Sequence, residues 1–162
     1  MRTFDDRRLY SASDLVNFLG CEHATMLDVG QLTSPVEFPA EDAQTQLLQA
    51  KGLEHERAYL ERLRERGLSI VELTDDGNLH ERAARTLDAM RSGVDVVFQG
   101  ALMAEPWHGF SDFLLKVDQP SALGAWSYDV ADTKLSRRAK PSHALQLCVY
   151  ADLLTRDRKS VV

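Results

Sequence analysis

Three apolar segments in the second half of the chain most constrain its fold. Residues 94–103 are rich in β-branched and apolar side chains, and residues 110–117 and 125–135 have the same character. The connection Asp118-Gln119-Pro120-Ser121 is typical of a turn, which predicts an antiparallel hairpin from the last two segments. A break from Pro106 to Gly109 separates the first strand from the second. We therefore predict a sheet at the centre of the domain.

Helical patterns lie on either side of these strands in the sequence. Ser11-Ala12-Ser13-Asp14 resembles a capping box, Asn78 can cap a helix, and Pro141 suits a first helical turn. A short strand is expected at 69–73 and a turn at 75–77, and residues 33–39 resemble a loop. The expected helices span residues 11–19, 21–29, 41–66, 78–90 and 141–155. Helices, a mixed sheet and a final helix make an α/β domain.

The composition is that of an ordinary soluble globular domain. The chain has 162 residues, of which 44% are hydrophobic and 27% charged. No apolar run approaches the ~18–20 residues of a membrane span, and the charged start has no apolar signal core, so we expect a cytoplasmic protein. The net charge of −6 does not suggest nucleic-acid binding. Phosphate contacts are local, however, and a nuclease gathers acidic groups, so the sign decides little.

Asp132 and Lys134 are the first candidate site residues. On a strand they project from the same face, because strand side chains alternate. The carboxylate can hold a divalent cation, and the ammonium can orient water or stabilise charge on a phosphate. Pairing in the predicted hairpin can also bring Asp112 close, and adjacent carboxylates repel unless a cation lies between them. The alternative is an exposed charge pair.

Glu56 lies in the middle of an apolar helical stripe formed by Leu53, Leu60 and Leu63. A glutamate there is costly unless it is paired or bound to metal. Its neighbour His55 is rotated by about 100° around the helix. Gly52 weakens the helix, which suggests close approach by another segment. Alternatively, this helix lies at the edge of the domain and both polar residues are solvated.

Gln146 and Tyr150 are four residues apart on the last predicted helix and share a face. They are either site residues or a half-buried polar pair. Just before this helix, Arg137, Arg138 and Lys140 could hold nucleic-acid phosphates, although such a charge run is often simply solvated.

These motifs follow the order Gly52-x-x-His55-Glu56, Gly109-x-x-Asp112, Asp132-x-Lys134 and Gln146-x-x-x-Tyr150. The order resembles the RecB-like nucleases of the PD-(D/E)xK superfamily, and the final motif is its most discriminating part. Residues 51–56, 107–109, 132–135 and 146–150 look especially like a bacterial group of such nucleases. The resemblance covers Tyr10 to about Leu154.

The resemblance implies a restriction-endonuclease-like core, a central mixed sheet flanked by helices. It implies that Asp112 and Asp132 bind Mg²⁺ or Mn²⁺ with help from Glu56 or His55; the helical stripe favours Glu56. Lys134 would be the catalytic lysine, with Gln146 and Tyr150 supporting the site. The implied function is metal-dependent hydrolysis of DNA in repair, recombination or CRISPR-type processing. Phe110 departs from the pattern, because many relatives carry a polar or basic residue there.

Many relatives also bind an iron–sulfur cluster through one cysteine before the nuclease core and three after it. Cys21 matches the early position, but the chain has two cysteines and lacks the later trio. This chain alone therefore cannot complete such a cluster. We expect Cys148, inside the last motif, to lie in the core.

The last six residues, 157–162, are a direct translation of GATCGGAAGAGCGTCGTG, the start of a common sequencing adapter. We therefore expect residues 1–156 to be an incomplete nuclease domain followed by a non-native tail. In the similar bacterial group a ribonuclease H-like or helicase region often follows. Two other hypotheses stay open: a catalytically silent nucleic-acid-binding module of the same fold, and a plain α/β interaction domain.

Overall fold

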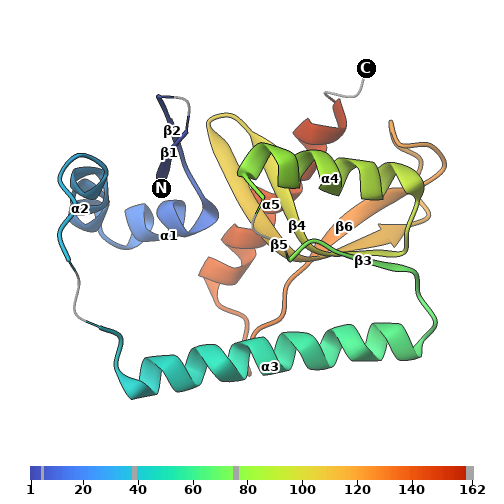
Figure 1. The fold of residues 1–162 in the computed structure, drawn as a ribbon, viewed down its shortest axis with the longest axis horizontal. Coiled ribbons are helices and arrows are strands. Elements are labelled where there is room, and N and C mark those ends of the chain that lie inside the picture. The colour runs from blue at the N-terminus through green and yellow to red at the C-terminus, as the bar shows by residue number, and fades with distance from the viewer. Residues whose placement is uncertain (5, 38–39, 75–76, 160–162) are drawn as a thin grey trace.

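A computed structural model of the chain describes residues 1–4, 6–37, 40–74 and 77–159 (Figure 1). Of residues 157–159 it describes the backbone alone. The strands are β1 (Arg2–Phe4), β2 (Arg7–Leu9), β3 (Ile70–Glu72), β4 (Val96–Ala104), β5 (Trp107–Val117) and β6 (Ser127–Ala131). The helices are α1 (Ala12–Gly20), α2 (Glu22–Thr33), α3 (Ala43–Glu65), α4 (Leu79–Ser92) and α5 (Pro141–Lys159).

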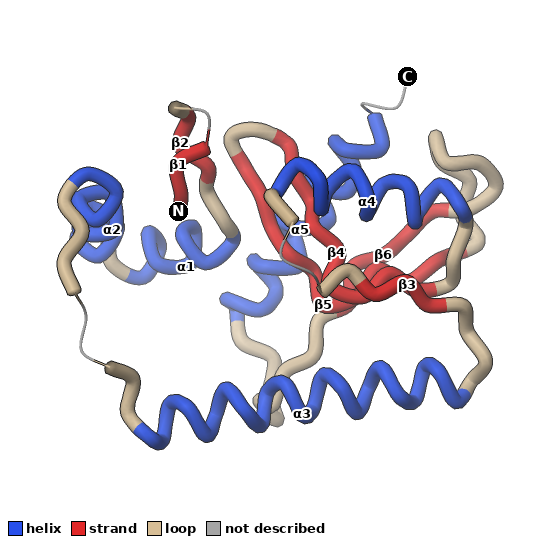
Figure 2. Tube along the Cα trace, in the orientation of Figure 1, coloured by secondary structure: helices blue, strands red, loops and turns tan. Residues whose placement is uncertain are grey.

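A mixed four-stranded sheet forms the centre of the fold, with strand order β3-β4-β5-β6 (Figure 2). β3 pairs with β4 in parallel, and the other neighbours are antiparallel. The predicted α/β class and the β5–β6 hairpin are therefore confirmed. Two strand boundaries were wrong. Residues 107–109 belong to β5 rather than to a break, because β4 and β5 already turn at 105–106, and β6 ends at Ala131, well before residue 135.

Local capping explains where several helices begin. Ser11 and Asp14 form the predicted capping box of α1, and Asn78 and Glu81 form another at α4. Pro141 is the first residue of α5, as expected. The β1–β2 hairpin was not predicted, because its short strands carry charged side chains instead of an apolar run.

Helices cover both faces of the sheet. On one face, Leu60 and Leu63 of α3 pack with Val96, Phe98 and Phe113. The other core joins α4 and α5 to the sheet and includes Met90, Val97, Leu102, Leu114, Tyr128 and Leu153. Alternating apolar residues of β4 and β5 thus supply both cores, which explains why these two strands hold the domain together.

The regular alternation breaks at one opposed pair, Gln99 and Asp112. Phe98 packs against α3, and the next residue, Gln99, also reaches α3 through a hydrogen bond to Glu56. Likewise Phe113 packs against α3 while its predecessor Asp112 lines a cavity beside that helix. A left-handed backbone, φ 58°, turns the Gln99 side chain toward α3. At this level of the sheet, Gln99 and Asp112 therefore both lie on the side of α3 instead of in the core under α4 and α5.

Gly109 allows α5 to approach β5 closely. A Cβ atom at this position would lie 2.8 Å from Cδ1 of Tyr150 and closer still to Cε1. Gly52 is different, since a Cβ atom there would meet nothing within 4 Å. The predicted close approach at Gly52 was therefore wrong, and the first half of α3 is exposed on most sides.

His108 is a buried polar residue on β5, with 3% of its surface exposed. Neither ring nitrogen has a hydrogen-bond partner among the described residues. The pKa of His108 is lowered from 6.5 to about 4; burial is the largest cause, the positive charges of Arg2 and the amino terminus add to it, and Asp14 has a smaller opposing effect. The folded protein therefore holds a neutral imidazole at neutral pH.

Some sequence predictions fall partly outside the described residues: the turn at 75–77, the loop at 33–39 and the tail at 157–162. α2 extends to Thr33, four residues beyond the predicted end. Within the described part of the chain, no helix is both long and apolar enough to cross a membrane.

We predict that alanine at Gly109 and alanine at Gly52 have opposite effects on the stability of the fold. Gly109→Ala forces the Tyr150 ring to move and should lower the free energy of unfolding by about 1–3 kcal/mol. Gly52→Ala adds a better helix former in open space and should raise it by about 0.5–1 kcal/mol. Urea denaturation of both variants measures these free energies. Equal effects would contradict the close contact between Gly109 and Tyr150.

The neutral His108 predicts a specific pH dependence of stability. Its folded pKa lies below its unfolded value, so its contribution is complete above pH 6.5 and is lost as the pH falls to about 4. His108→Leu should remove this loss. The free energy of unfolding of the variant, relative to that of the wild-type protein, should therefore increase as the pH falls from 6.5 to about 4. Denaturation curves from pH 7 to 4 measure it. His23→Leu, at an exposed histidine, should keep the wild-type dependence.

Candidate functional site

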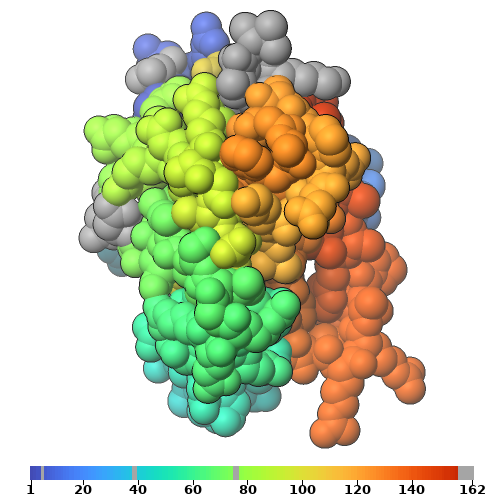
Figure 3. All heavy atoms as spheres, turned by 90° about the vertical axis from the view of Figure 1, so that its right-hand side faces the viewer, coloured from blue at the N-terminus to red at the C-terminus, as the bar shows by residue number. Residues whose placement is uncertain are grey.

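A cavity of about 530 Å³ lies between α3 and the end of the β5–β6 hairpin. In the space-filling view, a hollow separates α3 from the connection between β6 and α5 (Figure 3). The cavity is lined by three of the predicted site residues together with their neighbours: Gln49, Gly52, Leu53, Glu56, Asp112, Thr133, Lys134 and Leu135.

Asp112 lies at the centre of this group on β5. Its Oδ2 accepts hydrogen bonds from the amide of Thr133 at 2.9 Å and from the Thr133 hydroxyl at 3.3 Å. The pKa of the Asp112 carboxyl is raised from 3.8 to about 6. Burial is the largest cause, the hydrogen bond from the Thr133 amide opposes it, and the charges of Asp132 and Glu56 add to it. Asp112 thus lies within electrostatic reach of both other predicted carboxylates.

Asp132 and Lys134 lie together, as predicted, but not on a strand. They follow the end of β6, and the ammonium of Lys134 is 2.7 Å from Oδ2 of Asp132. The Asp132 side chain is 4% exposed and that of Lys134 36%. The pair is therefore half hidden, with a buried acid and a cation at the cavity wall. Strand alternation was the wrong reason for their proximity, since the chain has already left the sheet.

Glu56 is buried in α3, with 8% of its surface exposed, and it lines the cavity. Its Oε1 accepts a hydrogen bond from the Nε2 atom of Gln99. His55 is half-buried and does not line this cavity. Of the helical stripe, Leu60 and Leu63 are buried while Leu53 is 56% exposed at the cavity edge. The geometry places Glu56, rather than His55, beside Asp112.

Gln146 and Tyr150 meet on α5, where the Gln146 amide donates to the Tyr150 hydroxyl at 3.1 Å. The ring of Tyr150 packs where a Cβ atom of Gly109 would lie, which places it behind β5. Burial raises the pKa of Tyr150, the Gln146 hydrogen bond opposes this, and the charges of Asp132 and Asp112 contribute to the increase. The two motifs Gly109-x-x-Asp112 and Gln146-x-x-x-Tyr150 are thus in physical contact.

Each predicted carboxylate has its own donor: Thr133 for Asp112, Lys134 for Asp132 and Gln99 for Glu56. Among the described residues, no three His, Cys, Asp or Glu side chains are grouped closely enough to hold a metal ion. The chemistry of the donors nevertheless suits Mg²⁺ or Mn²⁺, which prefer carboxylate oxygens. Burial is the main cause of the raised pKa of Asp112, and a divalent cation would offset the charges of Asp132 and Glu56 that add to it.

The remaining predicted residues lie outside this cavity. Arg137, Arg138 and Lys140 are exposed on the connection that leads from Lys134 into α5. Cys21 is exposed between α1 and α2 and forms no disulfide. Cys148 is also exposed, so the prediction that it lies in the core was wrong. The reason is that Tyr150, Leu153 and Leu154 form the buried side of α5, and Cys148 lies off that side.

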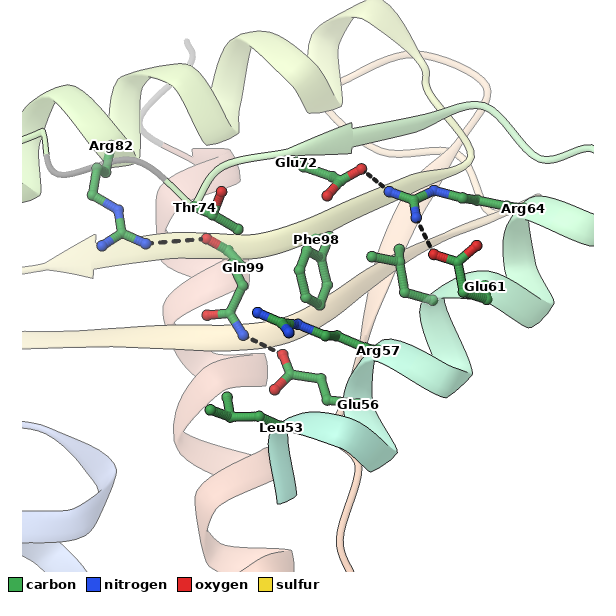
Figure 4. A pocket seen from close by; sticks show the side chains of 11 residues that line it. Leu53, Glu56, Arg57, Glu61, Arg64, Glu72, Thr74, Arg82, Phe98 and Gln99 are labelled. Atoms are coloured by element: carbon green, nitrogen blue, oxygen red, sulfur yellow. Dashed lines mark hydrogen bonds and ion pairs between the residues drawn. The ribbon is translucent and has the colours of Figure 1, made fainter. Parts of the chain in front are cut away.

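Sequence reasoning missed Gln99. A second cavity, of about 520 Å³, shares Leu53 and Glu56 with the first, and Gln99 forms part of its wall (Figure 4). The signal was present, since Gln99 is the one polar side chain in the apolar run from Val96 to Met103 and precedes a glycine. Phe110, where many of the similar nucleases carry a polar or basic residue, lies under the Arg82 guanidinium. The guanidinium carbon is 4.3 Å from the ring centroid.

Comparison of the chain with protein-family models, with curated proteins and with solved structures found no match. The case for any function therefore depends on the residues of this site and their geometry.

The raised pKa of Asp112 predicts that this carboxylate destabilises the fold at neutral pH. Its folded pKa exceeds its unfolded one, so its contribution to stability is lost as the pH rises from about 4 to about 6. Asp112→Asn should therefore raise the free energy of unfolding at pH 7 by about 1 kcal/mol, after allowance for solvent screening. At pH 4 the gain should vanish. Asp129→Asn, at an exposed carboxylate on β6, is the control and should change little at either pH.

Proposed function

We propose that this chain is a RecB-like nuclease domain of the PD-(D/E)xK superfamily, with a restriction-endonuclease-like core, that hydrolyses phosphodiester bonds of DNA. The observation that carries the proposal is the gathering of Glu56, Asp112 and Lys134 around one cavity, with Asp132 paired to the lysine. These residues come from three separate parts of the sequence. An interaction domain with incidental motifs gives no reason for them to share a cavity.

The chain's own residues supply most of the chemistry. Asp112, Asp132 and Glu56 would hold Mg²⁺ or Mn²⁺, and a bound cation would polarise the phosphate and lower the pKa of a water molecule. Lys134 lies at the cavity wall, where its ammonium can stabilise the charge that develops on the phosphate oxygens. Thr133 fixes the orientation of Asp112 through two hydrogen bonds to Oδ2.

Tyr150 and Gln146 support the site from behind β5. Their hydrogen bond fixes the tyrosine hydroxyl, and the Tyr150 ring occupies the space left by Gly109, three residues before Asp112. Packing of this kind limits the movement of Asp112. The pair therefore acts through position rather than by touching the substrate.

DNA is the proposed substrate, and the exposed cations Arg137, Arg138 and Lys140 would hold its phosphates beside the cavity. A helicase or ribonuclease H-like region would accompany the nuclease in a longer protein that acts in repair, recombination or CRISPR-type processing. Cys21 would serve an iron–sulfur cluster only if such a protein supplied three more cysteines.

A catalytically silent nucleic-acid-binding module of the same fold is the second candidate. One observation favours it, namely that every carboxylate of the site already has a donor from the chain itself. Metal-dependent hydrolysis requires a cation to bind these carboxylates in place of some of their present donors, whereas binding of DNA alone does not. The two candidates therefore differ in metal-dependent turnover.

A cleavage assay separates these candidates. With Mn²⁺ or Mg²⁺ we expect the chain to degrade single- or double-stranded DNA, and EDTA should stop it. Asp132→Ala and Lys134→Ala should each lower the rate at least ~100-fold, the scale expected on removing a group that stabilises charge at the reaction centre. Gel electrophoresis of labelled DNA measures the products.

Asp118→Ala is the matched control, because Asp118 is an exposed carboxylate in the β5–β6 turn at the other end of the hairpin. It should cleave at the wild-type rate. Full cleavage by Asp132→Ala and Lys134→Ala would refute the assignment of the site. Binding of DNA without cleavage under either ion would favour the silent module instead.

A further inference from the structure

Gln99 of β4 has a left-handed backbone instead of the extended backbone of a strand. Among described residues other than glycine, it shares a positive φ with Asp6 alone, and both have φ 58°. A side chain in this region of conformational space costs free energy, and such residues are frequent at functional sites. Gln99 lies opposite Asp112, between the pairs Phe98–Phe113 and Gly100–Ser111.

Arg82 of α4 holds this unusual backbone in place. Its Nη2 atom donates to the carbonyl oxygens of Leu73 at 3.1 Å and of Gln99 at 3.5 Å. The same guanidinium lies over the ring of Phe110. The loop after β3, the start of α4 and β5 thus meet at the backbone of residue 99. Figure 4 shows Arg82 and Glu56 on either side of Gln99.

The side chain of Gln99 then reaches across to α3. Its Nε2 donates to Oε1 of Glu56, and Oε2 of Glu56 has no donor among the described residues. A carboxylate that is 8% exposed needs such a donor, because an unpaired buried charge is costly. A regular strand would direct residue 99 away from α3, since Phe98 already points there. The left-handed backbone is therefore what allows this contact.

We propose that Gln99 is a positioning residue that holds Glu56 ready to act with Asp112, by occupying one carboxylate oxygen and leaving the other for a divalent cation. This inference rests on the proposed nuclease function and deepens it. A donor behind a metal-binding carboxylate fixes its orientation, and removal of such partners typically weakens metal binding or activity 10- to 100-fold. Gln99 does not itself touch the reacting atoms.

The test uses Gln99→Gly, which removes the amide and suits the left-handed backbone. Mn²⁺ binding is titrated by calorimetry without DNA, and kcat and KM are measured with DNA. We expect the Mn²⁺ dissociation constant to rise about 10-fold or more and kcat to fall about 10-fold, with KM for DNA unchanged. Asp6→Gly is the matched control, since it makes the same backbone change in the β1–β2 turn. It should alter neither quantity.

A second variant, Gln99→Asn, keeps the amide and tolerates a positive φ but is one methylene too short to reach Glu56. It should weaken Mn²⁺ binding as Gln99→Gly does, and it supplies the answer if the glycine variant does not fold. Wild-type Mn²⁺ affinity and kcat in a folded Gln99 variant would overturn the inference while the nuclease stands. Absence of Mn²⁺ binding and cleavage in the wild-type protein would overturn the proposed function and this inference together.

Discussion

The opposed pair Gln99 and Asp112 is the constraint on which the site depends. In a regular sheet these residues would alternate with Phe98 and Phe113 and point into the core that α4 and α5 cover. A left-handed backbone at Gln99 instead turns its side chain to Glu56 of α3, and Asp112 lines the cavity beside the same helix. Burial of Glu56 follows from this arrangement, because Gln99 gives it a hydrogen bond that an apolar strand cannot provide. The contact between Gln99 and Glu56 thus depends on one local departure from strand geometry.

The electrostatics of the cavity work against the stability of the fold. Asp112 is held near two other carboxylates, and its pKa rises to about 6 as a result of burial and of their charge. Lys134 offsets part of this negative charge through its ion pair with Asp132. Carboxylates with such raised pKa values are common where a protein must hold a cation or a charged substrate.

Much of the fold was predictable because its signals are local. The capping residues Ser11 and Asn78 and the apolar run of β4 act within a few positions. The proximity of Asp112 to Asp132 followed from the hairpin. The partner of Glu56 was not predictable, because it depends on a backbone torsion at residue 99 and on the distant Arg82. Cys148 was misplaced for a similar reason, since the buried side of α5 is set by where Tyr150 meets β5.

The contact between Gly109 and Tyr150 also bears on how a sequence like this one can vary. The aromatic ring fills the volume that any larger residue at 109 would need. Positions 109 and 150 are therefore a linked pair, although they lie 41 positions apart in the chain. A homologue with alanine at the first position should carry a smaller side chain at the second, and one with a bulky residue at 109 should have lost the tyrosine. Covariation between these two columns of an alignment would then report the docking of α5 on the sheet.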